Sequence, residues 1–406
     1  MNVSDTRPTP SGDLAESAAA LAPDLVTLRR DLHREPEIGL HLPRTQERVL
    51  RALDGLPLEV TTGRDTTSVT AVLRGGRRPG PVVLLRGDMD ALPIEEKAPV
   101  DYASANGAMH ACGHDLHTSM LVGAARLLSE RRDALAGDVL FMFQPGEEGH
   151  RGAEVMIREG VLDAAGTPPS AAYALHVTST TLPKGVFGSR PGPLMSAAGK
   201  LRVTVLGSGG HGSAPHQALD PIPAMCEMVL ALQTFVTRGF DVFDPVVLTV
   251  GTIHAGMAHN VIPDSGHFEA TIRSFSDDTS EKALRECVRV VRGVADAHGL
   301  KVEADVESLF PPTVNDEAEY ERARDQVLEL FGEDRWIDLP TPISASEDFS
   351  LVLQRVPGAM IFLGAHLPGV DPRTAPANHS PHAAFDDAVL ADGAALYAAL
   401  ALSHLG

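Results

Sequence analysis

The chain has 406 residues, 43% of them hydrophobic, and it carries 54 acidic against 34 basic side chains for a net charge of −20. This length exceeds what one hydrophobic core usually covers, so we expect two domains. The acidic balance, without a Lys/Arg-rich run, argues against nucleic acid as a partner, and no stretch approaches the roughly 20 uninterrupted apolar residues of a membrane-spanning helix.

Three cysteines are too few for a disulfide framework, and the compartment we expect is the reducing cytoplasm. Cys226 and Cys287 have apolar neighbours at helical spacing, so we expect both to be buried small hydrophobic residues. Residues 1–22 are rich in Pro, Ser, Thr and Ala and lack a positively charged start followed by an apolar core. They are predicted to form a flexible leader with no sign of export.

After the leader, helical leucine spacing and then apolar runs predict two helices followed by two strands, at Asp24–Arg34, Thr45–Leu53, Thr67–Leu73 and Pro81–Arg86. The last strand is nearly all apolar, which is typical of a strand buried on both faces. It delivers Asp88 and Asp90 to its carboxyl end, where open α/β sheets bind ligands. These carboxylates are predicted to ligate a metal or to orient an imidazole that does.

Metal-ligand side chains are concentrated in Met109–His117, which holds one thiol, three imidazoles and one carboxylate. Cys112 and His114 stand two residues apart, a spacing that can turn both donors toward one ion from a loop. An apolar stripe predicts a helix at His117–Leu128. A catalytic thiol is a second hypothesis, because a cysteine with histidines nearby can be a nucleophile.

Two more strands carry polar residues to the same predicted edge. Gly137–Phe143 is followed by the adjacent acids Glu147 and Glu148 between glycines. Such a pair can be an ordinary solvated turn, but here one carboxylate can bind an ion while the other faces the reacting water. Ala171–Val177 is a further strand, with His176 near its carboxyl end.

From about residue 195 the order becomes β-α-β-β-α-β, which predicts a small two-layer α/β unit inserted into the larger domain. Its elements are expected at Leu201–Leu206, Ile222–Phe235, Val246–Ile253, Gly266–Ser274, Ser280–His298 and Val302–Val306. Gly207–Gly212 matches G-x-G-x-x-G, but prolines delay the following helix and no acid ends the next strand, so dinucleotide binding is not expected. The glycines are instead predicted to expose His211 on a tight loop.

The larger domain then resumes with a helix, a buried strand and a closing helix, predicted at Tyr320–Phe331, Met360–Gly364 and Asp387–Leu402. A loop before the closing helix contains His379 and His382. Either is a candidate for the final metal ligand, and either can be a plain surface residue.

Six motifs together resemble the family of metallo-amidohydrolases that includes aminoacylases, hippurate hydrolases and auxin-conjugate hydrolases, in a wider group with carboxypeptidase G and bacterial dipeptidases. The resemblance runs in order from about Leu25 to the C-terminus. The motifs are Arg86-Gly-Asp-Met-Asp-Ala-Leu-Pro93, His110-Ala-Cys-Gly-His-Asp-Leu-His117, Gln144-Pro-Gly-Glu-Glu-Gly149, Ser189-Arg-Pro-Gly-Pro-Leu-Met195, His259-Asn-Val-Ile-Pro263 and Asn378-His-Ser-Pro381.

The resemblance implies an α/β fold with two parts. A mixed-sheet, dinuclear-metal aminopeptidase-like catalytic domain would comprise residues 23–194 and 310–406. A ferredoxin-like satellite domain, residues 195–309, would be inserted into it and mediate homodimerisation or a dimer-based homo-oligomer.

Individual roles are also implied by the resemblance. Glu147 would be the general acid/base, His211 would reach the oxyanion, and Arg273 would bind the substrate carboxylate with help from Asn260. The implied metal ligands are Cys112, His114, Glu148, His176 and His379. Two departures from the family pattern stand in this sequence: Gly39–Pro43 lacks the usual acidic residue, and Ala270–Ser274 replaces a glycine-led run.

We therefore expect a cytoplasmic enzyme that hydrolyses the amide bond of small-molecule N-acyl amino acids, using two divalent ions of zinc, manganese or cobalt. A dipeptidase or carboxypeptidase of the wider group is the alternative. A cysteine-nucleophile hydrolase and a non-catalytic metal-dependent binding protein are alternatives of other classes. Glu147 beside a predicted ligand favours an enzyme, and a metal-bound Cys112 would be consumed as a ligand.

Overall fold

The computed structural model describes residues 13–406, and the chain divides into two compact units, each with its own sheet and hydrophobic core. Unit 1 comprises the chain up to Gly192 together with Val314–Pro340 and Leu351–Gly406. Unit 2 comprises Pro193–Thr313 and Thr341–Ser350. Two short strands, β7 (Gly192–Met195) and β14 (Thr313–Asn315), lie where the chain passes from one unit to the other.

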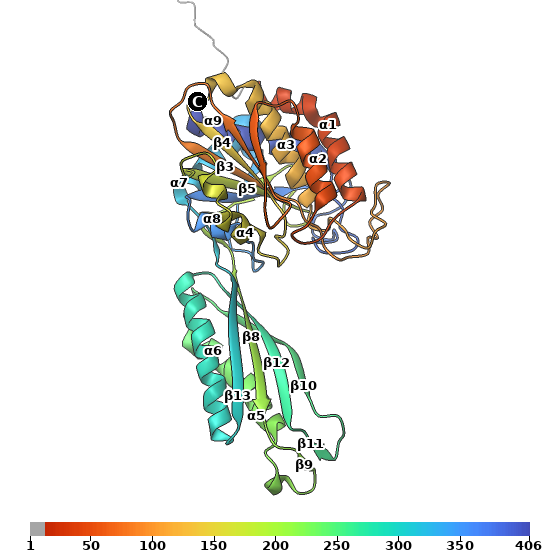
Figure 1. Ribbon diagram of the computed structural model, residues 1–406, viewed down its shortest axis with the longest axis vertical. Helices are drawn as coiled ribbons and strands as arrows, with labels where there is room; N and C mark the ends of the chain where they lie inside the picture. Colours follow the sequence, from red (N-terminus) through yellow and green to blue (C-terminus); the bar gives the residue numbers. More distant parts are fainter. Residues whose placement is uncertain (1–12) are drawn as a thin grey trace, which may run out of the picture. The chain divides into compact units, whose positions relative to one another are not determined.

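Unit 1 is built on an eight-stranded mixed sheet (Figure 1). In spatial order its strands are β1 (Leu58–Thr62), β2 (Val69–Arg74), β4 (Asp138–Gln144), β3 (Val82–Asp88), β5 (Ala171–Thr178), β16 (Gly358–Gly364), β6 (Phe187–Ser189) and β15 (Trp336–Asp338). The central strands β4, β3, β5 and β16 are parallel, so their carboxyl ends meet at one edge. The predicted mixed-sheet α/β class is confirmed.

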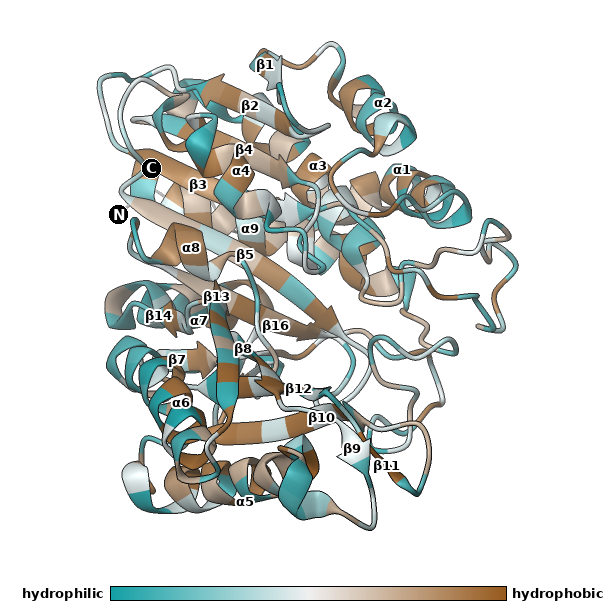
Figure 2. Ribbon diagram, turned by 60° about the horizontal axis from the view of Figure 1, so that its bottom comes forward, coloured by the Kyte–Doolittle hydropathy of each residue, from teal (hydrophilic) through white to brown (hydrophobic). Residues whose placement is uncertain are grey.

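Helices cover both faces of this sheet, which is why its central strands are buried along their whole length and mostly apolar (Figure 2). Figure 1 shows α1, α2 and α3 on one side and α4 on the other. The helices are α1 (Leu14–Arg34), α2 (Pro43–Leu53), α3 (His114–Glu130), α4 (Gly152–Arg158), α7 (Glu317–Phe331), α8 (Ser350–Leu353) and α9 (Leu390–Leu405). Alternate residues of β2 to β5 and β16 form one core with α1, α2, α3, α7 and α9.

The N-terminal leader prediction is wrong for residues 14–22, which form the first turns of α1. Leu14, Ala18 and Leu25 recur at helical spacing and are fully or almost fully buried, so apolar burial stabilises this segment. The rest of the predicted leader, residues 1–12, lies outside the described residues.

Unit 2 has a four-stranded antiparallel sheet in the order β10 (Val247–Ala255), β12 (Ser265–Ser274), β8 (Ala197–Leu206) and β13 (Lys301–Phe310). Two helices, α5 (Pro221–Gly239) and α6 (Asp277–Ala297), pack on one face of it (Figure 1). The chain order β8-α5-β10-β12-α6-β13 gives the predicted ferredoxin-like arrangement. A small ladder, β9 (Gly210–His211) with β11 (Val261–Ile262), lies beside it.

Cys287 is buried as predicted, but the same prediction for Cys226 is wrong, since this residue is exposed. The buried stripe of α5 runs through Ala224, Met225, Met228 and Leu232, and position 226 points away from it.

One segment of the described residues, Asp387–Leu405, is long and apolar enough to cross a membrane by length and composition alone. It contains Asp387 and Asp392 and is therefore not an uninterrupted apolar run. In the structure 67% of its apolar window is buried, and α9 contacts α1, α3 and α7. The apolar residues of α9 therefore pack in the hydrophobic core of unit 1.

Candidate metal centre and active site

Metal-ligand side chains gather at the carboxyl ends of the parallel strands of unit 1. Asp88 ends β3 and is paired in register with Gln144, which ends β4 and precedes the Glu147–Glu148 turn. His176 lies near the end of β5. The motif from His110 to His117 crosses this edge, and α3 begins at His114, three residues earlier than predicted, so both His114 and His117 lie in its first turn.

Gly113 makes this arrangement possible. It has a left-handed backbone with φ +86°, and a Cβ atom there would lie 2.3 Å from Cγ2 of Val177 on β5. Only glycine combines this conformation with so close an approach of α3 to the strand. Cys112 and His114 are thereby turned toward the same edge as His176.

Cys112 is the centre of the cluster. Its Sγ lies 3.4 Å from Nε2 of His176 and 3.2 Å from Nε2 of His379. The same His379 nitrogen lies 3.0 Å from Oε1 of Glu148. Ligand atoms of Cys112, His114 and His176 lie within 4.8 Å of one another, and so do those of Cys112, Glu148 and His379. Cys112 belongs to both sets, the position that a bridging ligand between two ions would take.

The imidazoles present lone pairs toward this centre. His176 Nδ1 donates to the carbonyl oxygen of Val177 at 2.8 Å, which leaves Nε2 as the acceptor nitrogen. His114 is buried, and neither of its ring nitrogens has a hydrogen-bond partner. Its Nδ1 lies 3.4 Å from Asp90 and its Nε2 3.7 Å from Asp88. A buried imidazole without partners is costly, so an ion at this position would satisfy it.

The charges of the cluster favour a cation. Burial alone would raise the pKa of the Cys112 thiol, but the charge of His176 and hydrogen bonds from the surrounding imidazoles hold it well below its usual value. Hydrogen bonds to Cys112 and Glu148 raise the pKa of His379 to about 10. A thiolate and a carboxylate that stabilise positive charge so strongly are suited to a divalent ion.

Asp88 and His117 form a hydrogen-bonded pair beside the cluster. His117 Nε2 accepts the backbone N–H of Val177 at 2.8 Å, so Nδ1 carries the proton and donates to Asp88 at 2.6 Å. Arg86 Nη1 also donates to Asp88, at 2.5 Å. Both ring nitrogens of His117 are occupied in this way. His117 and Asp88 therefore join the start of α3 to the ends of β3 and β5.

Asp90 fixes the turn that carries the acidic pair. Its two carboxylate oxygens accept the backbone N–H groups of Glu147 at 3.0 Å and of Glu148 at 3.1 Å. The turn begins at Gly146, whose φ is +72°. The two side chains point differently: Glu148 lies against His379, whereas Glu147 is buried beside His114 and Glu148.

Asn378 joins separate segments of the site, a role that its place in a sequence motif does not reveal. Its Nδ2 donates to the carbonyl oxygens of Cys112 and Val177 at 3.3 and 3.0 Å, and its Oδ1 accepts the N–H of Ser179 at 3.1 Å. This amide ties the loop of His379 to the Cys112 loop and to the end of β5. His382, the other candidate ligand, instead donates from Nδ1 to the carbonyl of Lys97 at 3.1 Å.

The remaining predicted residues belong to unit 2, whereas the predicted ligands belong to unit 1. His211 is exposed on β9, and its loop is joined to that of Asn260 by the 2.8 Å bond from Gly212 N–H to the Asn260 carbonyl. His211 Nδ1 accepts from the N–H and hydroxyl of Ser213, which leaves a proton on Nε2 for donation. Arg273 is half-buried and donates to Ser346 Oγ at 2.8 Å.

Within unit 2, His211 and Arg273 are not brought together. The His211 loop is bonded to Asp264, just before the first residue of β12, whereas Arg273 is the next-to-last residue of that strand. Eight residues of extended strand place them about 25 Å apart along β12.

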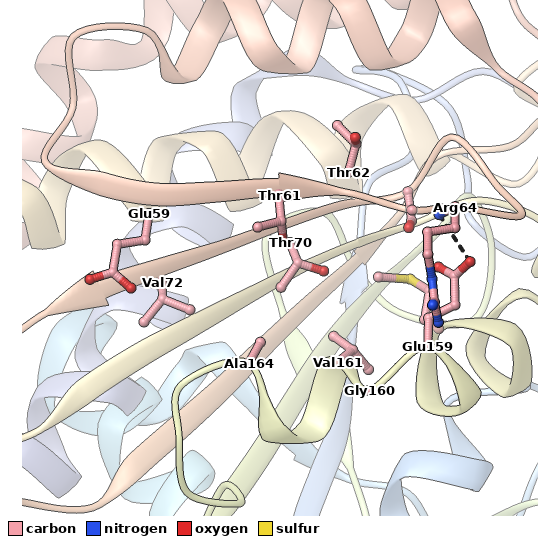
Figure 3. A pocket seen from close by; sticks show the side chains of 13 residues that line it. Glu59, Thr61, Thr62, Arg64, Thr70, Val72, Glu159, Gly160, Val161 and Ala164 are labelled. Carbon is pink, nitrogen blue, oxygen red and sulfur yellow. Dashed lines mark hydrogen bonds between the residues drawn. The ribbon is translucent and has the colours of Figure 1, made fainter.

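A separate groove lies on β1, β2 and the segment after α4 (Figure 3). Its lining contains threonines and two carboxylates but no histidine or cysteine. Glu159 accepts the backbone N–H groups of Arg64 and Asp65, and Glu59 is paired with Arg74. Because both acids already have partners, we assign no metal to this groove.

Comparison with known proteins agrees with this geometry. A family model for peptidase family M20/M25/M40 matches residues 84–403, most of the chain. The chain belongs to this peptidase family. Among M20 relatives, it is 36% identical to thermostable carboxypeptidase 2 of Saccharolobus solfataricus, covering 93% of this chain and 94% of that one. It is also 36% identical to IAA-amino acid hydrolase ILR1-like 5 of Arabidopsis thaliana, covering 94% and 86%.

Among solved structures, the M20 protein YXEP of Bacillus subtilis, described as a dinuclear metal binding peptidase, superposes with a TM-score of 0.81 at 30% identity. The match covers 95% of this chain and 98% of that one. The predicted resemblance is confirmed, and the chain is a metal-dependent hydrolase of the M20 family. Its thiolate, imidazole and carboxylate donors, with the orphaned ring of His114, fit such ions.

Proposed function

We propose that this M20 hydrolase cleaves the amide bond of N-acyl amino acids, releasing a carboxylic acid and a free amino acid. One observation carries the proposal: Asp90 holds both members of the Glu147–Glu148 pair by their backbone N–H groups, and Glu148 contacts the proposed ligand His379. Glu147 is thereby held beside the cluster as the general acid/base. Cys112, His114, Glu148, His176 and His379 are the proposed ligands of two divalent ions.

Bound ions supply Lewis acidity, which makes water a better nucleophile and polarises the amide carbonyl. Glu147 accepts the proton of the attacking water and passes it to the leaving nitrogen. His211 donates its Nε2–H to the carbonyl oxygen as that oxygen becomes negative. Its tautomer supports this role, because Ser213 occupies Nδ1. Arg273 pairs with the substrate carboxylate, and Asn260 assists beside His211.

The distance along β12 supports a second copy of the chain as partner. A small N-acyl amino acid does not span the roughly 25 Å between His211 and Arg273. One of the two therefore acts on a given substrate from a partner subunit. Unit 2 also exposes Leu230 on α5, and Val247 and Ile253 on the edge strand β10. Exposed apolar residues beside an unpaired strand edge favour self-association, and we propose a homodimer through unit 2.

The test is a panel of N-acetyl, N-benzoyl and longer N-acyl amino acids together with dipeptides. Each is added to chelated enzyme reloaded with zinc, manganese or cobalt, while light scattering gives the mass in solution. We expect N-acyl amino acids to be cleaved fastest. Cleavage of dipeptides alone would favour a dipeptidase or carboxypeptidase, the alternative suggested by the carboxypeptidase relative. A monomeric mass in solution would contradict the proposed homodimer.

A further inference from the structure

A second hollow in unit 1 has a volume of about 330 Å³ and lies beside the loop that carries His379. Its lining consists of two histidines, His366 and His382, and apolar residues from the segments that flank this loop. The apolar residues are Pro99, Leu367, Val370, Ala375, Pro376 and Ala384.

The hollow and the metal cluster share one short segment of chain, residues 376–382. On one side, His379 N–H donates to the Ala111 carbonyl at 2.9 Å, and its ring contacts Cys112. On the other side, the backbone of Pro381 and the ring of His382 bond to the backbone of Lys97, two residues before Pro99. A group that occupies the hollow would therefore lie against the loop that holds His379 in the cluster.

The hollow offers mainly carbon surface, and no Lys, Arg, Asp or Glu lines it. His366 Nε2 accepts the N–H of Lys184 at 3.0 Å and its Nδ1 donates to the Leu367 carbonyl at 3.1 Å, so both its ring nitrogens are used. A carboxylate would lose its hydration there without gaining a Lys or Arg partner. The amino acid half of a substrate is therefore disfavoured, and the neutral acyl half is favoured.

We propose that this hollow, the acyl pocket, receives the apolar acyl group of the substrate and selects chains longer than acetyl or rings such as benzoyl. The proposal rests on the function proposed above. The volume is sufficient, because a cavity of about 150 Å³ already accommodates benzene. Each methylene group that enters should raise kcat/KM about 4-fold.

The test measures kcat/KM for N-acetyl, N-butyryl, N-hexanoyl and N-benzoyl derivatives of one amino acid that the panel above shows to be accepted. For the native enzyme, the ratio of N-hexanoyl to N-acetyl should be on the order of 10². Val370→Trp, which fills the pocket, should lower this ratio at least 10-fold. Val60→Trp, on the exposed face of β1, is the matched control and should leave the ratio unchanged.

Ala384→Leu changes the lining residue that follows the His379 loop and fills less of the pocket, so it should lower the ratio less. This smaller substitution keeps the test valid if Val370→Trp does not fold. Metal content and Tm accompany each variant. The acyl pocket is overturned if the N-hexanoyl to N-acetyl ratio of the native enzyme is near 1. It is also overturned if both pocket variants keep the ratio of the native enzyme. In either case, cleavage of N-acetyl amino acids would still support the proposed function. If no N-acyl amino acid is cleaved and dipeptides are, the proposed function itself has failed.

Discussion

The metal cluster of unit 1 and the His211 loop of unit 2 differ in how firmly their side chains are held. Cys112 and His114 are 7% and 1% exposed. The segments around them are fixed by hydrogen bonds that Asp88 and Asp90 accept and that Asn378 donates. His211 is exposed and oriented only by Ser213 two residues away. The cluster is thus held in place by contacts within unit 1, whereas the side chain of His211 is held by one neighbour in its own loop. Changes in the cluster should therefore lower metal content, whereas a change at His211 should lower kcat with metal content unchanged.

Removing metal should have the largest effect. Dialysis against a chelator should reduce turnover below detection, and adding zinc, manganese or cobalt should restore it. The reason is that the clustered thiolate, imidazole and carboxylate donors would bind ions that the proposed reaction requires. Turnover before and after reloading is the measurement. If verified metal-free enzyme keeps full activity and loses that activity when Cys112 is alkylated, the result would favour the thiol-nucleophile hypothesis instead.

Changing Cys112 should come next in size, because this residue belongs to both ligand sets. Cys112→Ala should lose much of the metal and the activity with it, whereas Cys112→Asp should keep part of both, since a carboxylate can also bridge two ions. Metal content per chain, measured on purified protein, checks this. An alanine variant with full metal and no activity would mean that the thiol acts chemically.

His211→Ala should lower kcat by about 10²–10³ through loss of one oxyanion donor, with metal content and mass unchanged. If the donor comes from the partner subunit, mixing His211→Ala with Glu147→Gln protein should restore part of the activity, because hybrid dimers contain one intact site. No recovery after verified subunit exchange counts against action in trans. A fully active His211→Ala enzyme removes the role.

The parts of the fold that the sequence predicts well are those with strong periodicity. Ala171–Val177 differs from β5 by one residue, and the βαββαβ order of unit 2 is confirmed. β1 is missed because it is a short edge strand with mostly exposed residues. The first turns of α1 are missed because residues 1–22 are taken together, and the Pro, Ser and Thr of the first twelve residues hide the Leu and Ala that follow.

The candidate site follows the same rule. The dense motif from His110 to His117 names donors, but no pattern states which nitrogen a histidine presents. The part of Asn378 in joining Cys112, Val177 and Ser179 also depends on contacts between distant segments. The separation of His211 from Arg273 is likewise a matter of strand register, which motif spacing does not contain.

The smallest effect on activity is expected from labelling Cys226, which is exposed on unit 2. In the metal-loaded enzyme an alkylating reagent at pH 8 should modify this thiol first, with turnover unchanged. Cys112 is shielded as a ligand, and burial raises the pKa of Cys287 to about 12, so its thiolate is scarce at pH 8. Peptide mass analysis gives the order. Early modification of Cys287 would contradict its burial, and early modification of Cys112 would contradict ligation.

The most direct test of the account is the metal content of Glu147→Gln compared with Glu148→Gln. We predict that Glu147→Gln keeps both ions while kcat falls on the order of 10²-fold or more, as expected for a lost general base. Glu148→Gln should lose metal, because its carboxylate contacts His379 in the cluster. Loss of both ions from Glu147→Gln, with Glu148→Gln fully loaded, would contradict the assignment and reverse the roles of the pair.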